Sequence, residues 1–225
     1  MTSLLDSISS SLSPHSCIMC CNEGNVLCEN CQITLFDETL NQCWHCSQPA
    51  RFYETCSSCL PYSSLDGLFV IGAYKEQLKE AVRRYRYNFA QQLAQDVTKL
   101  FTRNLPYFEA PGVTFVPSSN QHRRQRGFDQ GALLAKTYAH EQKAKFFRGI
   151  ERLGRDTQVN ATREERAQQA KHHFVIYSHT GEVPETVFLF DDVVTTGASM
   201  NRCAELLKAA GAQTVFGVTL ARNVL

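Results

Sequence analysis

From about residue 65 onwards, apolar positions follow two alternating periodicities along the chain. Short, nearly continuous apolar runs predict buried strands, and apolar residues repeated every three or four positions predict helices that bury one face. Strands and helices that alternate in this way favour an α/β domain with a mostly parallel sheet flanked by helices. The predicted strands are 67–74, 113–116, 186–190 and 214–220, and the predicted helices are 77–100, 132–138, 163–170 and 199–210.

The first 60 residues lack a sustained hydrophobic period, and cysteines and turn-forming residues dominate there. Nine of the ten cysteines lie between Cys17 and Cys59. Pro61, Ser63 and Ser64 interrupt the pattern before the first predicted strand. We therefore predict three segments: a flexible or short helical tail over 1–16, a cysteine-rich module over 17–60 and an α/β domain over 65–225.

Eight of these cysteines form four Cys-x-x-Cys pairs. Two intervening residues let a tight turn direct both thiolates at one ion, and two such turns complete a tetrahedron around zinc. Four pairs in one short module therefore predict two structural zinc ions. The spacing leaves the partnering open between sequential and interleaved pairs, of which we favour the sequential one. The predicted ligands are Cys17, Cys20, Cys28, Cys31, Cys43, Cys46, Cys56 and Cys59.

Two neighbouring residues are alternative zinc ligands. Cys21 is the extra thiol beside Cys20, and His45 lies within the third cysteine pair. The simplest role for zinc is to fold a segment that is too poor in apolar residues to fold alone. Arg51 is the one basic residue between positions 17 and 60, which argues against DNA binding by the module itself.

Composition and charge narrow the setting of the protein. The chain has 225 residues, a formal net charge of +1 and 43% hydrophobic residues, as a soluble globular protein does. No run approaches the roughly 18 to 20 apolar residues of a membrane span, and the N-terminal segment lacks the basic start of a signal peptide. We expect a cytoplasmic protein that partners could hold at the inner face of the membrane. In a reducing compartment, paired cysteines hold metal more often than they form disulfides.

The segment Val187–Ser199 carries the most informative chemistry. An apolar strand ends at two adjacent acids, and a loop of small and hydroxyl residues then opens a helix. Free N–H groups at a helix start suit a phosphate, while acids at the carboxyl end of a strand suit ribose hydroxyls or magnesium. Capping the helix would need only one such residue. The predicted phosphate and ribose contacts are Asp191, Asp192, Val193, Val194, Thr195, Thr196, Gly197, Ala198 and Ser199, and Asp191 and Asp192 are also the catalytic candidates.

This segment resembles the phosphoribosyl-pyrophosphate signature of type I phosphoribosyltransferases. The order of elements, from the cysteine pairs through FVPSSNQHRRQRGFDQGALLA and ERAQQAKHHF to the signature, is similar to the ComF/GntX family over nearly all of Cys17 to Arg222. The element Arg126–Gln130 is especially close to the family's Arg-Gly-Phe-Asn-Gln, with Asp129 in place of Asn. The resemblance implies a phosphoribosyltransferase-type fold over 65–225 behind a double zinc ribbon.

The resemblance also implies further binding residues. The loop after the strand 113–116 would face pyrophosphate, and a flexible loop would close over the site. Gln158 and Arg166 match the family's Gln and Arg. Gln169 stands where Asn is usual, and Ala161 where Leu is usual. The pyrophosphate candidates are Ser118, Ser119, Arg124, Arg126, Gln158 and Arg166, and the implied ligands are phosphoribosyl pyrophosphate and Mg²⁺.

Three functions fit these observations. The first, which the family resemblance favours, is support of natural transformation: uptake and handling of single-stranded DNA with DNA-uptake proteins such as a competence helicase. Arginine clusters at 83–86, 123–126 and 148–166 suit the phosphates of DNA as well as those of phosphoribosyl pyrophosphate. The second is an active phosphoribosyltransferase that acts on an unidentified acceptor. The third is a zinc-ribbon scaffold with a relic site, and the intact acid pair counts against it.

Overall fold

The structure, a computed structural model, describes most of the chain. The described residues are 15–17, 19–35, 42–50, 53–74, 78–79, 82–83, 90–105, 107–109, 111–153 and 173–223. Within these ranges, no helix combines the length and the apolar character that a membrane crossing requires. Residues 1–14 of the predicted N-terminal tail over 1–16 lie outside the described residues, as does the predicted helix over 163–170.

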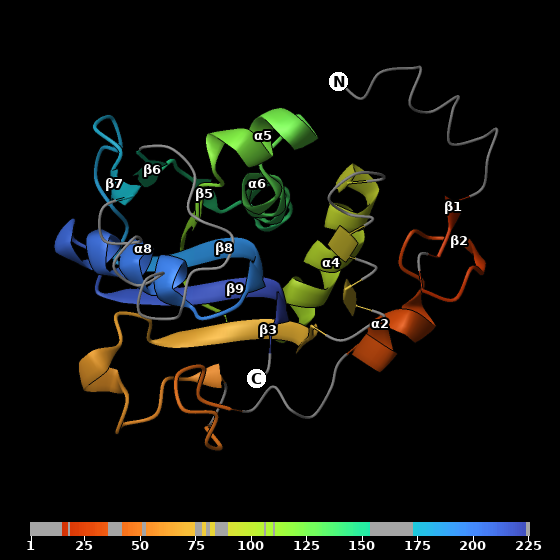
Figure 1. Cartoon of the computed structure of the whole chain (residues 1–225), viewed down its shortest axis with the longest axis horizontal. Coiled ribbons are helices and arrows are strands. Elements are labelled where there is room, and N and C mark those ends of the chain that lie inside the picture. Colours follow the sequence, from red (N-terminus) through yellow and green to blue (C-terminus); the bar gives the residue numbers. More distant parts are fainter. Residues whose placement is uncertain are drawn as a thin grey trace.

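A five-stranded sheet forms the centre of the molecule (Figure 1). Its strands are β3 (Gly67–Ala73), β4 (Gly112–Phe115), β5 (Lys145–Phe146), β8 (Thr186–Val194) and β9 (Thr214–Arg222). The strand order is β3-β9-β8-β4-β5, and every neighbouring pair is parallel. The central strands are almost continuously apolar because both of their faces are covered.

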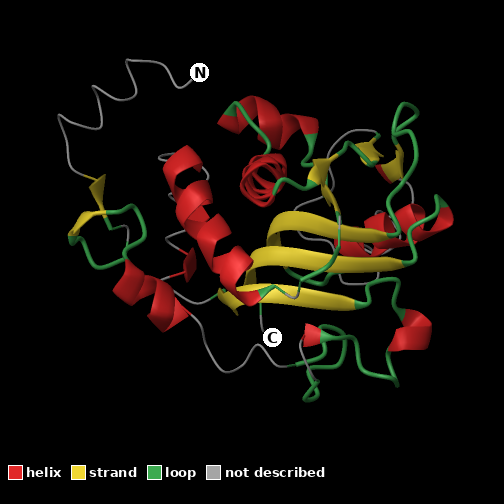
Figure 2. Ribbon diagram, turned by 180° about the vertical axis from the view of Figure 1, so that it is seen from behind, coloured by secondary structure: helices red, strands yellow, loops and turns green. Residues whose placement is uncertain are grey.

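Helices cover the two faces of this sheet (Figure 2). They are α4 (Ala90–Asn104), α5 (Asn120–Arg126), α6 (Gln130–Gln142) and α8 (Ala198–Ala209). Apolar residues of α4 and α6 share one core cluster with Phe69 and Ile71 of β3. Residues of α8 share a second cluster with Leu68 and Val70. Successive residues of a strand point to opposite faces, so the two clusters lie on opposite sides of the sheet.

The cysteine-rich module is joined to both clusters. Its elements are β1 (His15–Ser16), β2 (Glu23–Gly24), α2 (Glu29–Leu35) and the 3-10 turn η3 (Leu60–Tyr62). Val26 and Leu27 belong to the cluster of α4, whereas Trp44 belongs to the cluster of α8. The module therefore contributes side chains to the core on each side of the sheet, although composition alone suggests a separate unit.

The predicted fold class, a mostly parallel sheet flanked by helices beside a cysteine-rich N-terminal region, is confirmed. Several elements differ from the sequence prediction, among them the short strand β5, which was not predicted. The strand β8 continues four residues past Phe190, because β9 supplies backbone partners as far as Val194. The helix α5 has no apolar stripe that could have revealed it. The short strands β6 (Ile150–Arg152) and β7 (Phe174–Ile176) pair with each other on either side of the segment 154–172.

Candidate functional site

The acid pair lies at the carboxyl edge of the sheet, within β8. The ladder between β4 and β8 ends at Phe190, whose carbonyl accepts a hydrogen bond of 2.9 Å from the Val116 N–H. On the other side, β9 stays paired with β8 as far as Val194. Asp191 and Asp192 are thus strand residues, not the first residues of a loop, and they follow the point where pairing with β4 stops.

The two acids influence opposite sides of the sheet. Burial raises the pKa of the Cys203 thiol on α8, and the charge of Asp191 raises this pKa further. Burial also raises the pKa of Asp129 at the start of α6, and the charge of Asp192 adds to that effect. Asp192 is buried, whereas Asp191 is half-buried. The pair therefore spans the edge of the sheet, as adjacent strand residues must.

The loop after β8 leads directly into α8. Gly197 is the N-cap residue, and its φ of 74° lies in the left-handed region, which favours glycine. Among the described side chains, none forms a hydrogen bond that caps this helix in the usual way. The Ala198 N–H lies 3.4 Å from the Thr196 hydroxyl oxygen. A helix start of this kind keeps N–H donors for a bound anion.

The element Arg126–Gln130 forms the joint between α5 and α6. Gly127 ends α5 with a φ of 81°. Asp129 begins α6, because its Oδ1 accepts from the Ala132 N–H at 3.3 Å. Its Oδ2 accepts from the Ser118 N–H at 2.8 Å. Asp129 thereby fastens the loop that follows β4 to α6, and it does so beside the acid pair.

Four of the predicted pyrophosphate residues, Ser118, Ser119, Arg124 and Arg126, lie on α5 or directly before it. Ser118 and Ser119 follow β4 and lie at the same edge as the acid pair, since β4 and β8 are parallel neighbours. The buried Ser119 hydroxyl accepts from the His122 N–H at 3.2 Å and so caps α5. Arg126 donates to Gln130 Oε1 at 3.0 Å. Gln158 and Arg166 lie outside the described residues, as do positions 161 and 169.

An open cleft with a volume of about 1070 Å³ lies between β4, α5, α6 and β5. The rings of Phe115 and Phe146 stack there with centroids 6.2 Å apart and planes 7° apart. Basic side chains line the cleft: Arg123, Arg124, Lys136 and Arg148. Both rings are half-buried. A basic groove lined by aromatic side chains suits phosphates that carry bases. The sequence revealed the arginines, but the aromatic members come from different strands and were not predicted.

The cysteines gather into two groups of four. The first comprises Cys17, Cys20, Cys28 and Cys31, and the second Cys43, Cys46, Cys56 and Cys59; in each group all the sulfur atoms lie within 4.8 Å of one another. The grouping is sequential, as we favoured. One sulfur–sulfur distance is 3.6 Å in each group, between Cys20 and Cys28 and between Cys46 and Cys56. A zinc tetrahedron with Zn–S bonds of about 2.3 Å has edges of about 3.8 Å, so both tetrads suit structural zinc.

The two tetrads also share an electrostatic pattern. Burial tends to raise the pKa of Cys17, but three backbone N–H groups outweigh it and lower this pKa to about 6. Cys43 has the same opposing causes and the same pKa of about 6. Burial and neighbouring thiols raise the pKa of Cys31, and they raise that of Cys59 to about 12. Thiolates this close repel one another, and a divalent cation held between them would remove that repulsion.

The alternative ligands lie outside the tetrads. Cys21 is exposed and belongs to neither group. His45 is half-buried, and its ring meets that of Trp44 edge to face, with centroids 5.3 Å apart. Trp44 was not singled out by sequence reasoning, yet it is only 6% exposed and packs against the start of α8. The feature of the sequence that could have drawn attention to Trp44 is its position between two cysteines of a predicted zinc site.

Two curated proteins resemble the chain along most of their length, although no protein-family profile matches it. "Competence protein F" of Haemophilus influenzae (strain Rd) is 27% identical over 214 residues, which cover 88% of this chain and 91% of the relative. "Competence protein ComFC" of Streptococcus pneumoniae (strain R6) is 24% identical over 205 residues, which cover 89% of this chain and 90% of the relative.

Solved structures give a more distant similarity. The allosteric regulatory enzyme of purine biosynthesis has 20% identity and a TM-score of 0.41, with 61% of this chain and 30% of that chain covered. A hypoxanthine phosphoribosyltransferase from Staphylococcus aureus has 16% identity and a TM-score of 0.32, with 59% of this chain and 62% of that chain covered. The chain thus spans less than two thirds of either solved protein. The similarity to the two competence proteins confirms the family resemblance: this chain is a homologue of the ComF-type competence proteins over nearly nine-tenths of its length.

Proposed function

We propose that the chain binds phosphoribosyl pyrophosphate at the carboxyl edge of its sheet and serves a ComF-like role in natural transformation. One observation carries the proposal: an acid pair and a helix start without a side-chain cap lie together beyond the end of the β4–β8 ladder. In open α/β sheets, ligands bind at the carboxyl ends of the strands. The homology to competence proteins supports the biological setting.

In this proposal, Asp191 and Asp192 accept hydrogen bonds from the ribose hydroxyls. The loop and first turn over 195–199 hold the 5′-phosphate through backbone N–H groups and the side chains of Thr195, Thr196 and Ser199. The loop at Ser118 and Ser119 faces the pyrophosphate, whose charge Arg124 and Arg126 help to balance. Mg²⁺ bound with the ligand would neutralise further phosphate charge, and carboxylates at this edge are ligands that it accepts.

The basic and aromatic cleft supports the second part of the proposal, the handling of single-stranded DNA. Its arginines and lysine suit a phosphate backbone, and its stacked Phe115 and Phe146 suit bases. A cytoplasmic protein at the inner face of the membrane, in contact with DNA-uptake proteins such as a competence helicase, would meet such a strand on entry. The two cysteine tetrads would hold structural zinc in this protein.

Calorimetry with phosphoribosyl pyrophosphate and Mg²⁺ tests the ribosyl site. Replacing both acids, Asp191→Ala with Asp192→Ala, should weaken binding by between about ten-fold and several hundred-fold, because two hydrogen bonds of about 1 to 3 kcal/mol each are lost. Glu185→Ala is the matched control, since it removes an exposed acid just before the opposite end of the same strand. Equal affinity in the wild type and the double variant would contradict the site.

A second measurement separates the accessory role from an enzyme. The purified protein is mixed with single-stranded DNA alone and then with phosphoribosyl pyrophosphate and candidate acceptors. Tight DNA binding without pyrophosphate release supports the accessory role. Pyrophosphate release that depends on an acceptor would instead assign phosphoribosyl transfer to the protein.

A further inference from the structure

The second cysteine tetrad touches the proposed phosphate loop through one side chain. Trp44 lies between two of the tetrad's ligands, Cys43 and Cys46, and is buried in the cluster on the α8 side of the sheet. Its ring covers Gly197 so closely that a Cβ atom there would collide with Trp44 Cζ3 and lie 2.9 Å from Cε3. The indole ring is therefore the wall against which the loop turns into α8.

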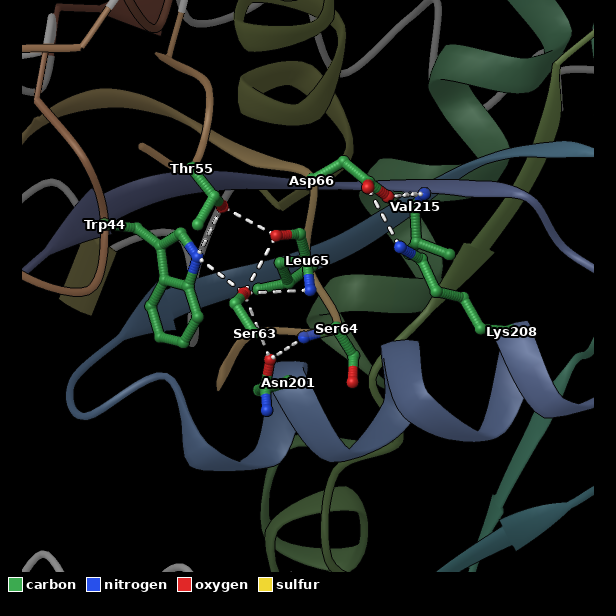
Figure 3. A network of polar contacts seen from close by, with 9 residues as sticks. All are labelled: Trp44, Thr55, Ser63, Ser64, Leu65, Asp66, Asn201, Lys208 and Val215. Atoms are coloured by element: carbon green, nitrogen blue, oxygen red, sulfur yellow. Dashed lines mark hydrogen bonds and ion pairs between the residues drawn. The ribbon is translucent and has the colours of Figure 1, made fainter. Parts of the chain in front are cut away.

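Hydrogen bonds hold Trp44 in this position at its indole ring, as Figure 3 shows, and at its backbone carbonyl. The indole Nε1–H is directed at the hydroxyl oxygens of Thr55, at 3.0 Å, and Ser63, at 3.2 Å. The Trp44 carbonyl accepts from Arg222 Nη2 at 2.6 Å. Thr55 precedes Cys56, another ligand of the same tetrad. The ring, which lies between the first two cysteines of the second tetrad, is thus fixed by residues that flank its last two cysteines.

A second connection reaches the first turn of α8. Asn201 Oδ1 accepts from the Ser64 N–H at 2.8 Å, and the Ser63 hydroxyl that faces Trp44 also donates to the Leu65 carbonyl at 2.8 Å (Figure 3). The Asn201 N–H donates to the Gly197 carbonyl at 2.8 Å. One continuous network therefore joins the second tetrad, the segment just before β3 and the first turn of α8. The first tetrad packs on the other side of the sheet.

We propose that Trp44 is a positioning residue for the phosphate loop, and that the second zinc site governs the affinity of that loop for phosphoribosyl ligands. The proposal rests on the phosphate site proposed above. Gly197 has a left-handed conformation that few residues adopt, and the indole wall keeps the loop from relaxing out of it. Loss of metal from the tetrad would release Trp44 and the loop together. By linkage, ligand binding would also tighten metal binding at this site.

Trp44 itself reports on the loop, because it is the only tryptophan of the chain. The full-length, zinc-loaded protein is titrated with phosphoribosyl pyrophosphate and Mg²⁺, and separately with ribose 5-phosphate. Tryptophan emission is followed beside calorimetry on the same samples. We expect a saturable change in emission whose midpoint matches the calorimetric dissociation constant for both ligands, since both carry the phosphate that the loop would hold.

Two substitutions at this position test the positioning role. Trp44→Leu removes the wall and should weaken binding of phosphoribosyl pyrophosphate about tenfold, a loss of about 1.4 kcal/mol. Trp44→Phe retains an aromatic ring but lacks the Nε1–H donor. It should bind phosphoribosyl pyrophosphate more tightly than Trp44→Leu and less tightly than the wild type. Thermal unfolding is measured on each variant, because a purely structural residue would lower the melting temperature without changing the affinity of the folded protein.

The outcomes separate this inference from the proposed function. Suppose that the wild type binds phosphoribosyl pyrophosphate by calorimetry. If its tryptophan emission then stays unchanged, or if Trp44→Phe and Trp44→Leu bind with the affinity of the wild type, the inference is overturned and the phosphate site remains supported. Wild-type protein that binds neither ligand by calorimetry overturns both. If Trp44→Leu does not fold, the wild-type emission and the Trp44→Phe affinity decide the question.

Discussion

The two cysteine tetrads have the same local chemistry and different surroundings. Each joins two Cys-x-x-Cys turns, each has an opening cysteine whose pKa backbone N–H groups lower to about 6, and each has a sulfur–sulfur distance of 3.6 Å. The first lies beside α4, where Asp96 Oδ2 accepts from the buried Leu27 N–H at 3.1 Å. The second holds Trp44 against Gly197, at the start of α8.

This difference shows that the spacing of cysteines predicts where a metal binds but not which part of the protein the metal stabilises. A structural ion stabilises whatever its ligands are packed against. For the first tetrad this is an α4 surface distant in sequence from the acid pair, and for the second it is the loop that we propose to hold phosphate. A zinc ion in the first tetrad would therefore stabilise the fold, whereas a zinc ion in the second tetrad would also stabilise a ligand site.

Removal of both zinc ions should have the largest effect on stability. The module supplies residues to both core clusters, so chelation should cost at least about 4 kcal/mol of unfolding free energy and lower the melting temperature by about 8 to 16 °C. Calorimetric unfolding before and after chelation measures this, and elemental analysis of untreated protein should give two zinc ions per chain. Protein purified without chelators that contains no zinc would contradict both tetrads.

Gly197→Ala should have the next largest effect, because it combines two penalties. The left-handed backbone costs about 1 to 2 kcal/mol for a residue with a Cβ, and the collision with Trp44 adds about 1 to 3 kcal/mol. Gly127→Ala is the matched control: its φ is 81°, and nothing lies within 4 Å of the added atom. Denaturant unfolding should show that Gly197→Ala lowers the free energy of unfolding more than Gly127→Ala does. When Trp44 is also replaced by Leu, the difference between the two substitutions should become smaller. Equal losses at the two glycines would show that Trp44 exerts no constraint.

Asp96→Ala should have a smaller effect and sharpen the contrast between the tetrads. It leaves the buried Leu27 N–H without its acceptor, at a cost of about 1 to 3 kcal/mol. Asp96→Asn retains an acceptor oxygen and serves as the control. Because the first tetrad lies on the α4 side, neither variant should change the affinity for phosphoribosyl pyrophosphate. A loss of affinity in the folded Asp96→Ala protein would show that the first module also influences the ligand site.

Much of the sheet could be predicted because its signal is local. Buried parallel strands read as apolar runs, and β3, β4, β8 and β9 begin within a residue of their predicted positions. The end of β8 could not be predicted, since Asp191 and Asp192 look like loop residues and only pairing with β9 keeps them in the strand. The helix α5 was missed for a different reason: Ser119 and Gly127 define its ends, but no apolar stripe marks its length.

The candidate site divides in the same way. The cysteine ligands, the acid pair and the glycine of the loop follow from spacing and residue type within short segments. The contact between Trp44 and Gly197 joins residues 153 positions apart, and no short pattern encodes it. Asp129 was noted as a departure from Asn, but its bond to the Ser118 N–H emerged only from the fold. Sequence reasoning therefore found the parts of the site and missed the contacts that hold them together.

The most direct test compares one substitution in each tetrad. Cys20→Ser and Cys46→Ser replace corresponding exposed ligands, so each variant loses one ligand of one zinc site. Calorimetry with phosphoribosyl pyrophosphate and Mg²⁺ is performed on both folded variants and on the wild type. Cys46→Ser should weaken binding at least about tenfold, a loss of about 1.4 kcal/mol, and Cys20→Ser less than about threefold. Equal losses in the two variants, or wild-type affinity in Cys46→Ser, would contradict the account.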